Sequence, residues 1–131
     1  MAREATCSCG QLRVVCEGEP HRISICHCLA CQKRTGSVFG VQARFREDEV
    51  TIEGRSAEWV RVGDDGYTIR FHFCPTCGST VFYRADFMPG AVAVAVGAVA
   101  DPTFPAPRVA VYEERRHPWV EMPGLNVEHD D

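Results

Sequence analysis

The chain has 131 residues, of which 45% are hydrophobic and 24% charged, and its formal net charge is −4. This size and composition are typical of one soluble globular domain, and we expect a single domain over residues 1–131. No apolar run approaches the ~20 residues of a membrane-spanning helix. An acidic chain also gains no electrostatic attraction to nucleic acid phosphates. We therefore expect neither a membrane protein nor a nucleic-acid-binding protein.

Short segments in which apolar and polar side chains alternate dominate the chain, and this alternation predicts β-strands. The first strand covers residues 12–16 and ends at Cys16. The clearest covers residues 68–73, where Arg70 and His72 are expected on the outward face. Further strands are expected at residues 38–45, 50–53, 58–62, 80–84, 92–99 and 109–112.

One short helix interrupts this pattern. Residues 29–35 predict one or two helical turns that end near Gly36. Turns rich in glycine, aspartate and proline separate the strands. The polar residues 127–131 are expected to be frayed. The fold class is therefore mainly β.

Seven of the eight cysteines fall into three tight groups: Cys7 with Cys9, Cys26 with Cys28 and Cys31, and Cys74 with Cys77. Thiolates at such spacings can hold a tetrahedral Zn²⁺, which favours sulfur ligands. The alternative is a set of disulfides or buried free thiols. Because the chain does not begin with the apolar segment of a signal peptide, we expect a cytoplasmic protein with reduced thiols, which favours zinc.

The first and last groups together predict a closed, structural zinc site. Cys74 and Cys77 are separated by two residues and followed by Gly78, which is the form of a zinc knuckle. Gly78 can adopt the positive φ that turns backbone N–H groups toward sulfur. Cys7 and Cys9 would complete four ligands and join segments that are distant in the chain, which a structural metal does well.

The middle group predicts an open zinc site. Cys26, Cys28 and Cys31 lie at the end of a strand that leads into the short helix. Catalytic zinc sites commonly have three protein ligands and leave the fourth position to water or substrate. Lys33 and Arg34 follow the group, and their charge could attract a carboxylate ligand, but a solvated helix face is the favoured interpretation.

Three residues are alternatives for a fourth ligand that would close this site: His27, Cys16 and His72. His27 adjoins two of the cysteines, but neighbouring residues on an extended strand point to opposite sides. Cys16 fits an ordinary buried strand thiol, and His72 fits a solvent-exposed position. For Tyr112 and Trp119, core packing is favoured over a place in a ligand wall.

Together these motifs resemble the family of glutathione-dependent formaldehyde-activating enzymes, which includes centromere protein V. The resemblance rests on residues 7–10, 26–36 and 73–79, with later landmarks at residues 97–102 and 116–119, and it covers a core of about residues 5–121. It implies a β-tent architecture, a two-sheet and mainly antiparallel zinc-binding fold. It also implies one structural zinc on Cys7, Cys9, Cys74 and Cys77, and a second, catalytic zinc on Cys26, Cys28 and Cys31.

The resemblance implies addition of the glutathione thiol to formaldehyde. We therefore expect a zinc-dependent carbon–sulfur lyase that acts on a glutathione-like thiol adduct of formaldehyde or another small aldehyde. The histidine that many family members carry before the final tryptophan is absent from residues 110–112. The alternative function is a non-enzymatic zinc module for protein interaction or thiol redox sensing, because the sequence shows no convincing general acid or base beside the triplet.

Overall fold

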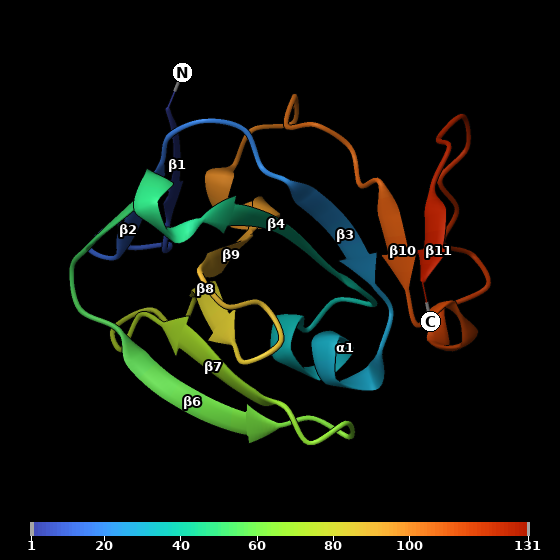
Figure 1. The fold of residues 1–131 in the computed structure, drawn as a ribbon, viewed down its shortest axis with the longest axis horizontal. Helices are drawn as coiled ribbons and strands as arrows, with labels where there is room; N and C mark the ends of the chain where they lie inside the picture. Colours follow the sequence, from blue (N-terminus) through green and yellow to red (C-terminus); the bar gives the residue numbers. More distant parts are fainter. Residues whose placement is uncertain (1, 131) are drawn as a thin grey trace.

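The computed structural model describes residues 2–130, which form two β-sheets and one α-helix (Figure 1). The smaller sheet has the order β1-β2-β5 and the larger one β11-β10-β3-β4-β9-β8-β7-β6. The strands are β1 (Arg3–Thr6), β2 (Arg13–Cys16), β3 (Arg22–Cys26), β4 (Gly40–Arg46), β5 (Val50–Glu53), β6 (Ala57–Val62), β7 (Thr68–Phe73), β8 (Thr80–Ala85), β9 (Ala91–Ala95), β10 (Val109–Val111) and β11 (Glu128–Asp130). The predicted mainly β fold with one short helix is confirmed.

The larger sheet is strongly bent. Figure 1 shows one arm with β3, β10 and β11 and another with β6 and β7, and helix α1 (Leu29–Thr35) lies between them. Most strand pairs are antiparallel, as expected, but β10 is parallel to both β3 and β11. The bend therefore creates an inner face beside the helix, on which side chains from both arms can meet.

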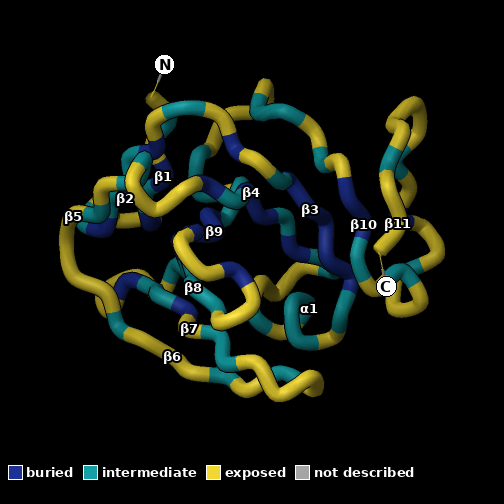
Figure 2. Tube along the Cα trace, viewed as in Figure 1, coloured by how far each residue is buried: buried dark blue, intermediate teal, exposed yellow. Residues whose placement is uncertain are grey.

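The main hydrophobic core lies between the two sheets. Leu12 and Val14 from the smaller sheet pack there with Ile23, Phe45 and other apolar residues of the larger one. Figure 2 shows buried residues along β3, β4 and β9, whereas β6 and β11 at the two sheet edges are mostly exposed. Because side chains alternate along a strand, the faces of β3 and β4 opposite this core are free to carry polar groups.

Helix α1 confirms the sequence prediction at both ends. Cys28 is the N-terminal cap, and its Sγ accepts a hydrogen bond from the Cys31 N–H. Gly36 ends the helix in the left-handed conformation with φ of 71°, as glycine readily does. At seven residues α1 is short, and no helix in the described part of the chain is long and apolar enough to cross a membrane.

Three predicted segments differ from the structure. The strand expected at residues 92–99 ends at Ala95, where pairing with β4 stops, and a 3-10 helix follows at Val96–Val99. The strand expected at 109–112 ends at Val111. The tail expected to be frayed forms β11 at Glu128–Asp130, because it finds a free edge of β10; residue 131 lies outside the described residues. β1 was not predicted at all.

Candidate metal centres

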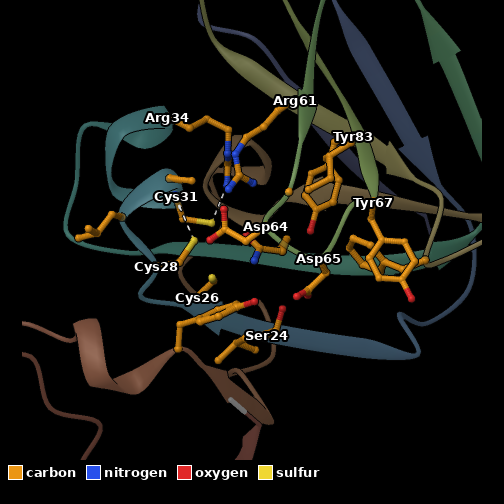
Figure 3. Close-up of a pocket in the computed structure, with 18 of the residues that line it drawn as sticks. Ser24, Cys26, Cys28, Cys31, Arg34, Arg61, Asp64, Asp65, Tyr67 and Tyr83 are labelled. Atoms are coloured by element: carbon orange, nitrogen blue, oxygen red, sulfur yellow. Dashed lines mark hydrogen bonds between the residues drawn. The ribbon is translucent and has the colours of Figure 1, made fainter.

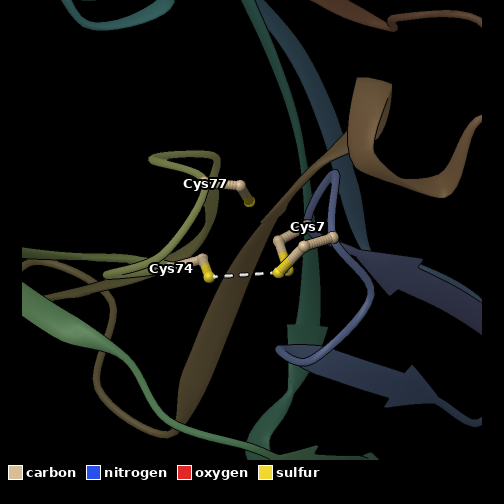
Figure 4. Close-up of side chains that lie close together, drawn as sticks. Cys7, Cys74 and Cys77 are labelled. Carbon is tan, nitrogen blue, oxygen red and sulfur yellow. Dashed lines mark hydrogen bonds between the residues drawn. The ribbon is translucent and has the colours of Figure 1, made fainter.

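Four cysteines meet between the two sheets. Cys7 and Cys9 lie in the turn between β1 and β2, and Cys74 and Cys77 lie in the turn between β7 and β8 (Figure 4). Their four Sγ atoms lie within 4.8 Å of one another, and Cys9 Sγ is 3.6 Å from the sulfurs of both Cys7 and Cys74. Tetrahedral zinc with Zn–S bonds of about 2.3 Å separates its sulfurs by about 3.8 Å. The donor set therefore fits Zn²⁺.

Hydrogen bonds reach several of these sulfurs, and those to Cys74 and Cys77 favour the thiolate form that a metal requires. The Leu12 N–H donates to Cys7 Sγ at 3.3 Å, and the Gln11 side-chain amide donates to Cys74 Sγ at 3.0 Å. The Ser79 hydroxyl contacts Cys77 Sγ at 3.5 Å, and this hydrogen bond lowers the pKa of Cys77 to about 5. Donors aimed at ligand sulfurs are the usual surroundings of a metal–thiolate site.

The three remaining grouped cysteines meet at the start of α1. Cys26 ends β3, Cys28 caps the helix and Cys31 lies in its first turn, and their Sγ atoms lie within 4.8 Å of one another. Hydrogen bonds from the sulfurs of Cys26 and then Cys31 lower the pKa of Cys28 to about 2. Conversely, the hydrogen bond with Cys28 raises the pKa of Cys26. This cluster is also a suitable set of sulfur ligands.

None of the three alternative fourth ligands joins this cluster. His27 is fully buried, and its ring lies 6.2 Å from the Phe39 ring, with no hydrogen-bond partner for either nitrogen among the described residues. Cys16 is buried in the main core, and burial raises its pKa to about 11. Within residues 2–130, no other His, Cys, Asp or Glu lies within 4.8 Å of all three sulfurs.

His72 differs from its predicted exposed position. Its Nδ1 lies 2.8 Å from the Ser56 hydroxyl and its Nε2 lies 3.2 Å from the Glu58 carboxylate. The imidazole also stacks on Phe82 with 4.5 Å between ring centroids. His72 therefore belongs to a polar network on the outer face of the sheet, away from the cysteine triplet.

A cavity of about 640 Å³ opens beside the triplet (Figure 3). Both arms of the bent sheet and helix α1 form its walls. Besides the three cysteines, its lining includes five arginines and six aromatic residues: Arg22, Arg34, Arg44, Arg61, Arg115, Trp59, Tyr67, Phe71, Tyr83, Phe87 and Tyr112. The lining also includes four acidic residues, Asp64, Asp65, Glu114 and Asp130, so arginines exceed carboxylates by one. The cavity therefore offers both positive and negative groups to a polar ligand.

Several of these lining residues were interpreted differently from the sequence. Arg34 does not point into solvent, because its Nη2 lies 3.8 Å from Cys31 Sγ and its guanidinium lies over the Phe71 ring. Tyr112 lines the cavity instead of the core and holds a left-handed backbone with φ of 54°. Trp119 is 70% exposed, so it is not a core residue either. Arg22 and Arg44 were not noticed, although strand alternation from Cys26 would have pointed to Arg22.

Two clusters of closely spaced sulfurs on a mainly β fold, one of them opening into a cavity, define a protein equipped to bind zinc. The family model for glutathione-dependent formaldehyde-activating enzymes matches residues 2–115, and the chain belongs to this family. The resemblance inferred from the motifs is thereby confirmed. A search of curated proteins gives no match.

A crystal structure of a Rhodobacter sphaeroides protein has a similar fold, with a TM-score of 0.54 and 20% sequence identity. The likeness covers 72% of this chain and 85% of that chain. At this identity the comparison concerns the fold alone.

Proposed function

We propose that this protein is a zinc enzyme that adds a glutathione-like thiol to formaldehyde or another small aldehyde and catalyses the reverse cleavage. The observation that carries the proposal is a cluster of three cysteine sulfurs at the wall of a large cavity, with no fourth protein ligand among residues 2–130. Membership of the formaldehyde-activating family agrees with this chemistry.

The two clusters would have different roles. Cys7, Cys9, Cys74 and Cys77 would hold a structural zinc, because they join turns of the two sheets. Cys26, Cys28 and Cys31 would hold a second zinc with one coordination position left. Zinc bound there would lower the pKa of a coordinated thiol or polarise an aldehyde carbonyl. We expect two zinc ions per chain and a cytoplasmic location, where thiols stay reduced.

The cavity side chains can perform the remaining steps. In the addition, a bond forms between sulfur and the carbonyl carbon, the carbonyl π electrons move to oxygen, and that oxygen takes up a proton. Tyr83 lines the cavity, and burial raises the pKa of its hydroxyl, so the hydroxyl stays protonated at neutral pH and can donate a hydrogen bond to that oxygen, while solvent supplies the proton. Arg34, beside Cys31, stabilises negative charge on a thiolate or an alkoxide.

Replacing one ligand of the triplet tests the proposal. The Cys28→Ser variant should lose the catalysed exchange between formaldehyde, glutathione and their adduct, which magnetisation-transfer NMR measures after subtraction of the uncatalysed rate. The matched control is Cys16→Ser, which removes a thiol outside both clusters. Exchange at the wild-type rate in Cys28→Ser would contradict the proposal, and no catalysed exchange in the wild-type protein would favour the non-enzymatic zinc module.

A further inference from the structure

A row of polar side chains extends from the cysteine triplet along the inner face of the sheet. We call it the polar ladder; it consists of Ser24, Gln42, Arg22 and Arg44. β3 and β4 are antiparallel, and their register places Ser24 opposite Gln42 and Arg22 opposite Arg44. Because side chains alternate along a strand, Cys26 shares a face with Ser24 and Arg22, and all of these residues line the cavity. At about 3.3 Å per residue, Arg22 lies roughly 13 Å along the strand from Cys26.

Two arginines face each other at the far end of this ladder, and Arg44 is the one without an ion pair among the described residues. Arg44 makes no ion pair or side-chain hydrogen bond within residues 2–130, and its guanidinium lies 5.9 Å from the centre of the Phe87 ring. Burial and then the nearby Arg22 lower the pKa of Arg44. Like charges directly opposite each other on neighbouring strands are unfavourable. An anion bound between these arginines would remove the repulsion.

Neighbouring polar atoms also have unused hydrogen-bonding capacity. Gln42 is only 8% exposed, and its Oε1 is buried with no hydrogen-bond partner in the described residues. The Nε of Arg22 is buried and equally without a partner. Buried polar atoms normally have partners, and leaving them without one costs free energy. Gln42 Oε1 can accept a hydrogen bond from a ligand N–H, and Arg22 Nε can donate one to a ligand oxygen. This part of the cavity therefore suits a ligand that carries both kinds of group, as a peptide with a carboxylate does.

A carboxylate from the chain itself already reaches this place. Asp130 of β11 accepts a hydrogen bond from Arg22 Nη2 at 3.3 Å, and it lines the same cavity. The contact shows that a carboxylate fits beside Arg22. Asp130 occupies only Arg22, however, and leaves Arg44 unpaired.

We propose that Arg44, together with Arg22, forms a carboxylate-binding subsite at the end of the cavity away from the cysteines. The inference rests on the proposed function for the position of the ligand's sulfur at the triplet. The ladder then selects a thiol that carries a carboxylate on the order of 10 Å from its sulfur, the reach of a short peptide in extended form. Asp130 competes with this carboxylate for Arg22, so removing its charge strengthens binding.

Binding without chemistry tests the subsite. The probes are S-methylglutathione, whose carboxylates are free, and its diethyl ester, and titration calorimetry on the zinc-loaded protein measures both affinities. Arg44→Gln should weaken the binding of S-methylglutathione by roughly 10- to 100-fold, the effect of one charge-assisted hydrogen bond, and leave the affinity for the ester unchanged. Arg46→Gln is the matched control, because Arg46 follows on the same strand but pairs with Asp48 outside the cavity.

The outcomes separate the subsite from the proposed function. Three results would overturn the subsite, whatever the Cys28→Ser turnover shows. The Arg44→Gln variant could bind S-methylglutathione with wild-type affinity, or it could bind the acid and the ester equally less tightly. The third is that the wild-type protein does not bind S-methylglutathione. Selective weakening of the acid form would support it even in a protein without turnover. Asp130→Asn should raise the affinity for S-methylglutathione several-fold. Unchanged or weaker binding would contradict the competition by Asp130.

Discussion

The Sγ atoms of Cys9 and Cys74 lie 3.6 Å apart although 65 residues separate them in the chain. The turn that carries Cys9 belongs to the smaller sheet, and the turn that carries Cys74 joins two strands of the larger one. A metal bound at this point would therefore link the two sheets beside their common core (Figure 4). This placement supports the structural role proposed for the four-cysteine cluster.

Replacing Cys74 by serine should remove one zinc per chain and lower the free energy of unfolding by more than about 3 kcal/mol, because structural zinc supplies much of the folding energy at such sites. Elemental analysis and urea unfolding measure the two effects. Cys16→Ala is the control: it should keep both zinc ions and lose about 1–2 kcal/mol through the small cavity it leaves in the core. Full zinc content in Cys74→Ser would refute the assignment.

Gln11 should hold the four-cysteine cluster in place. Its amide donates to the Arg55 carbonyl at 2.7 Å and to Cys74 Sγ at 3.0 Å, and its Oε1 accepts from the Arg55 N–H at 3.0 Å. We expect Gln11→Leu to lower the free energy of unfolding by about 2–3 kcal/mol and to speed zinc loss to a chelator. Arg55→Ala keeps the backbone groups that Gln11 contacts, so it should lose zinc at the wild-type rate. Equal rates in both variants would disprove this role.

Trp59 should report ligand binding. It lines the cavity and stacks on Phe71 with 5.6 Å between the ring centroids, whereas Trp119 is 70% exposed and outside the cavity lining. In a Trp119→Phe variant the fluorescence therefore comes from Trp59 alone, and S-methylglutathione should shift or quench it in a saturable way. In the complementary Trp59→Phe variant the emission of Trp119 should not change. A response from Trp119 instead would place the ligand elsewhere.

Local patterns in the sequence were sufficient to predict the features that are determined by residues close together in the chain. The helix at Leu29–Thr35 was predicted because Gly36 ends it in a conformation that glycine favours. Both cysteine clusters were predicted because zinc ligands recur at short spacings. The helix and the cysteine triplet depend on residues that are close in the chain, so the sequence alone shows them. The meeting of Cys7 and Cys9 with Cys74 and Cys77 spans 65 residues, and it was predicted from the ligand number that zinc requires.

The remaining features depend on contacts between distant residues. The strand at Ala91–Ala95 ends where its pairing with β4 ends, which the continuing alternation of valine and alanine cannot indicate. Arg22 and Arg44 become neighbours only through the register of β3 and β4. Arg34 was interpreted as solvated because the sequence does not show that the second arm of the sheet covers that helix face. The cavity was therefore beyond sequence reasoning, whereas its cysteines were not.

Cys16 should make the protein less stable at alkaline pH. Burial raises its pKa from 9.0 to about 11 in the folded state, so between these values the thiol ionises first in the unfolded state, and this ionisation stabilises the unfolded state. This contribution to stability is complete below pH 9 and is lost as the pH rises toward 11. Urea unfolding at pH 8, 9 and 10 should show little extra loss of wild-type stability between pH 8 and 9, and a fall of about 1 kcal/mol between pH 9 and 10 beyond that of Cys16→Ala. Parallel curves for the two proteins would contradict the shift.

Ala100 should be a site where glycine increases stability. It ends the 3-10 helix at Val96–Val99 with φ of 53°, a left-handed conformation that alanine adopts at a cost and glycine does not. Ala100→Gly should therefore raise the free energy of unfolding by about 0.5–1 kcal/mol, the strain relieved less the added chain entropy. Ala98 lies in the same turn but has no positive φ, and its methyl group packs on the core. Ala98→Gly should therefore lower the free energy of unfolding by a similar amount, because glycine there adds flexibility and removes that methyl group. Urea unfolding of both variants decides the matter: destabilisation by both would show that the backbone at Ala100 is not strained.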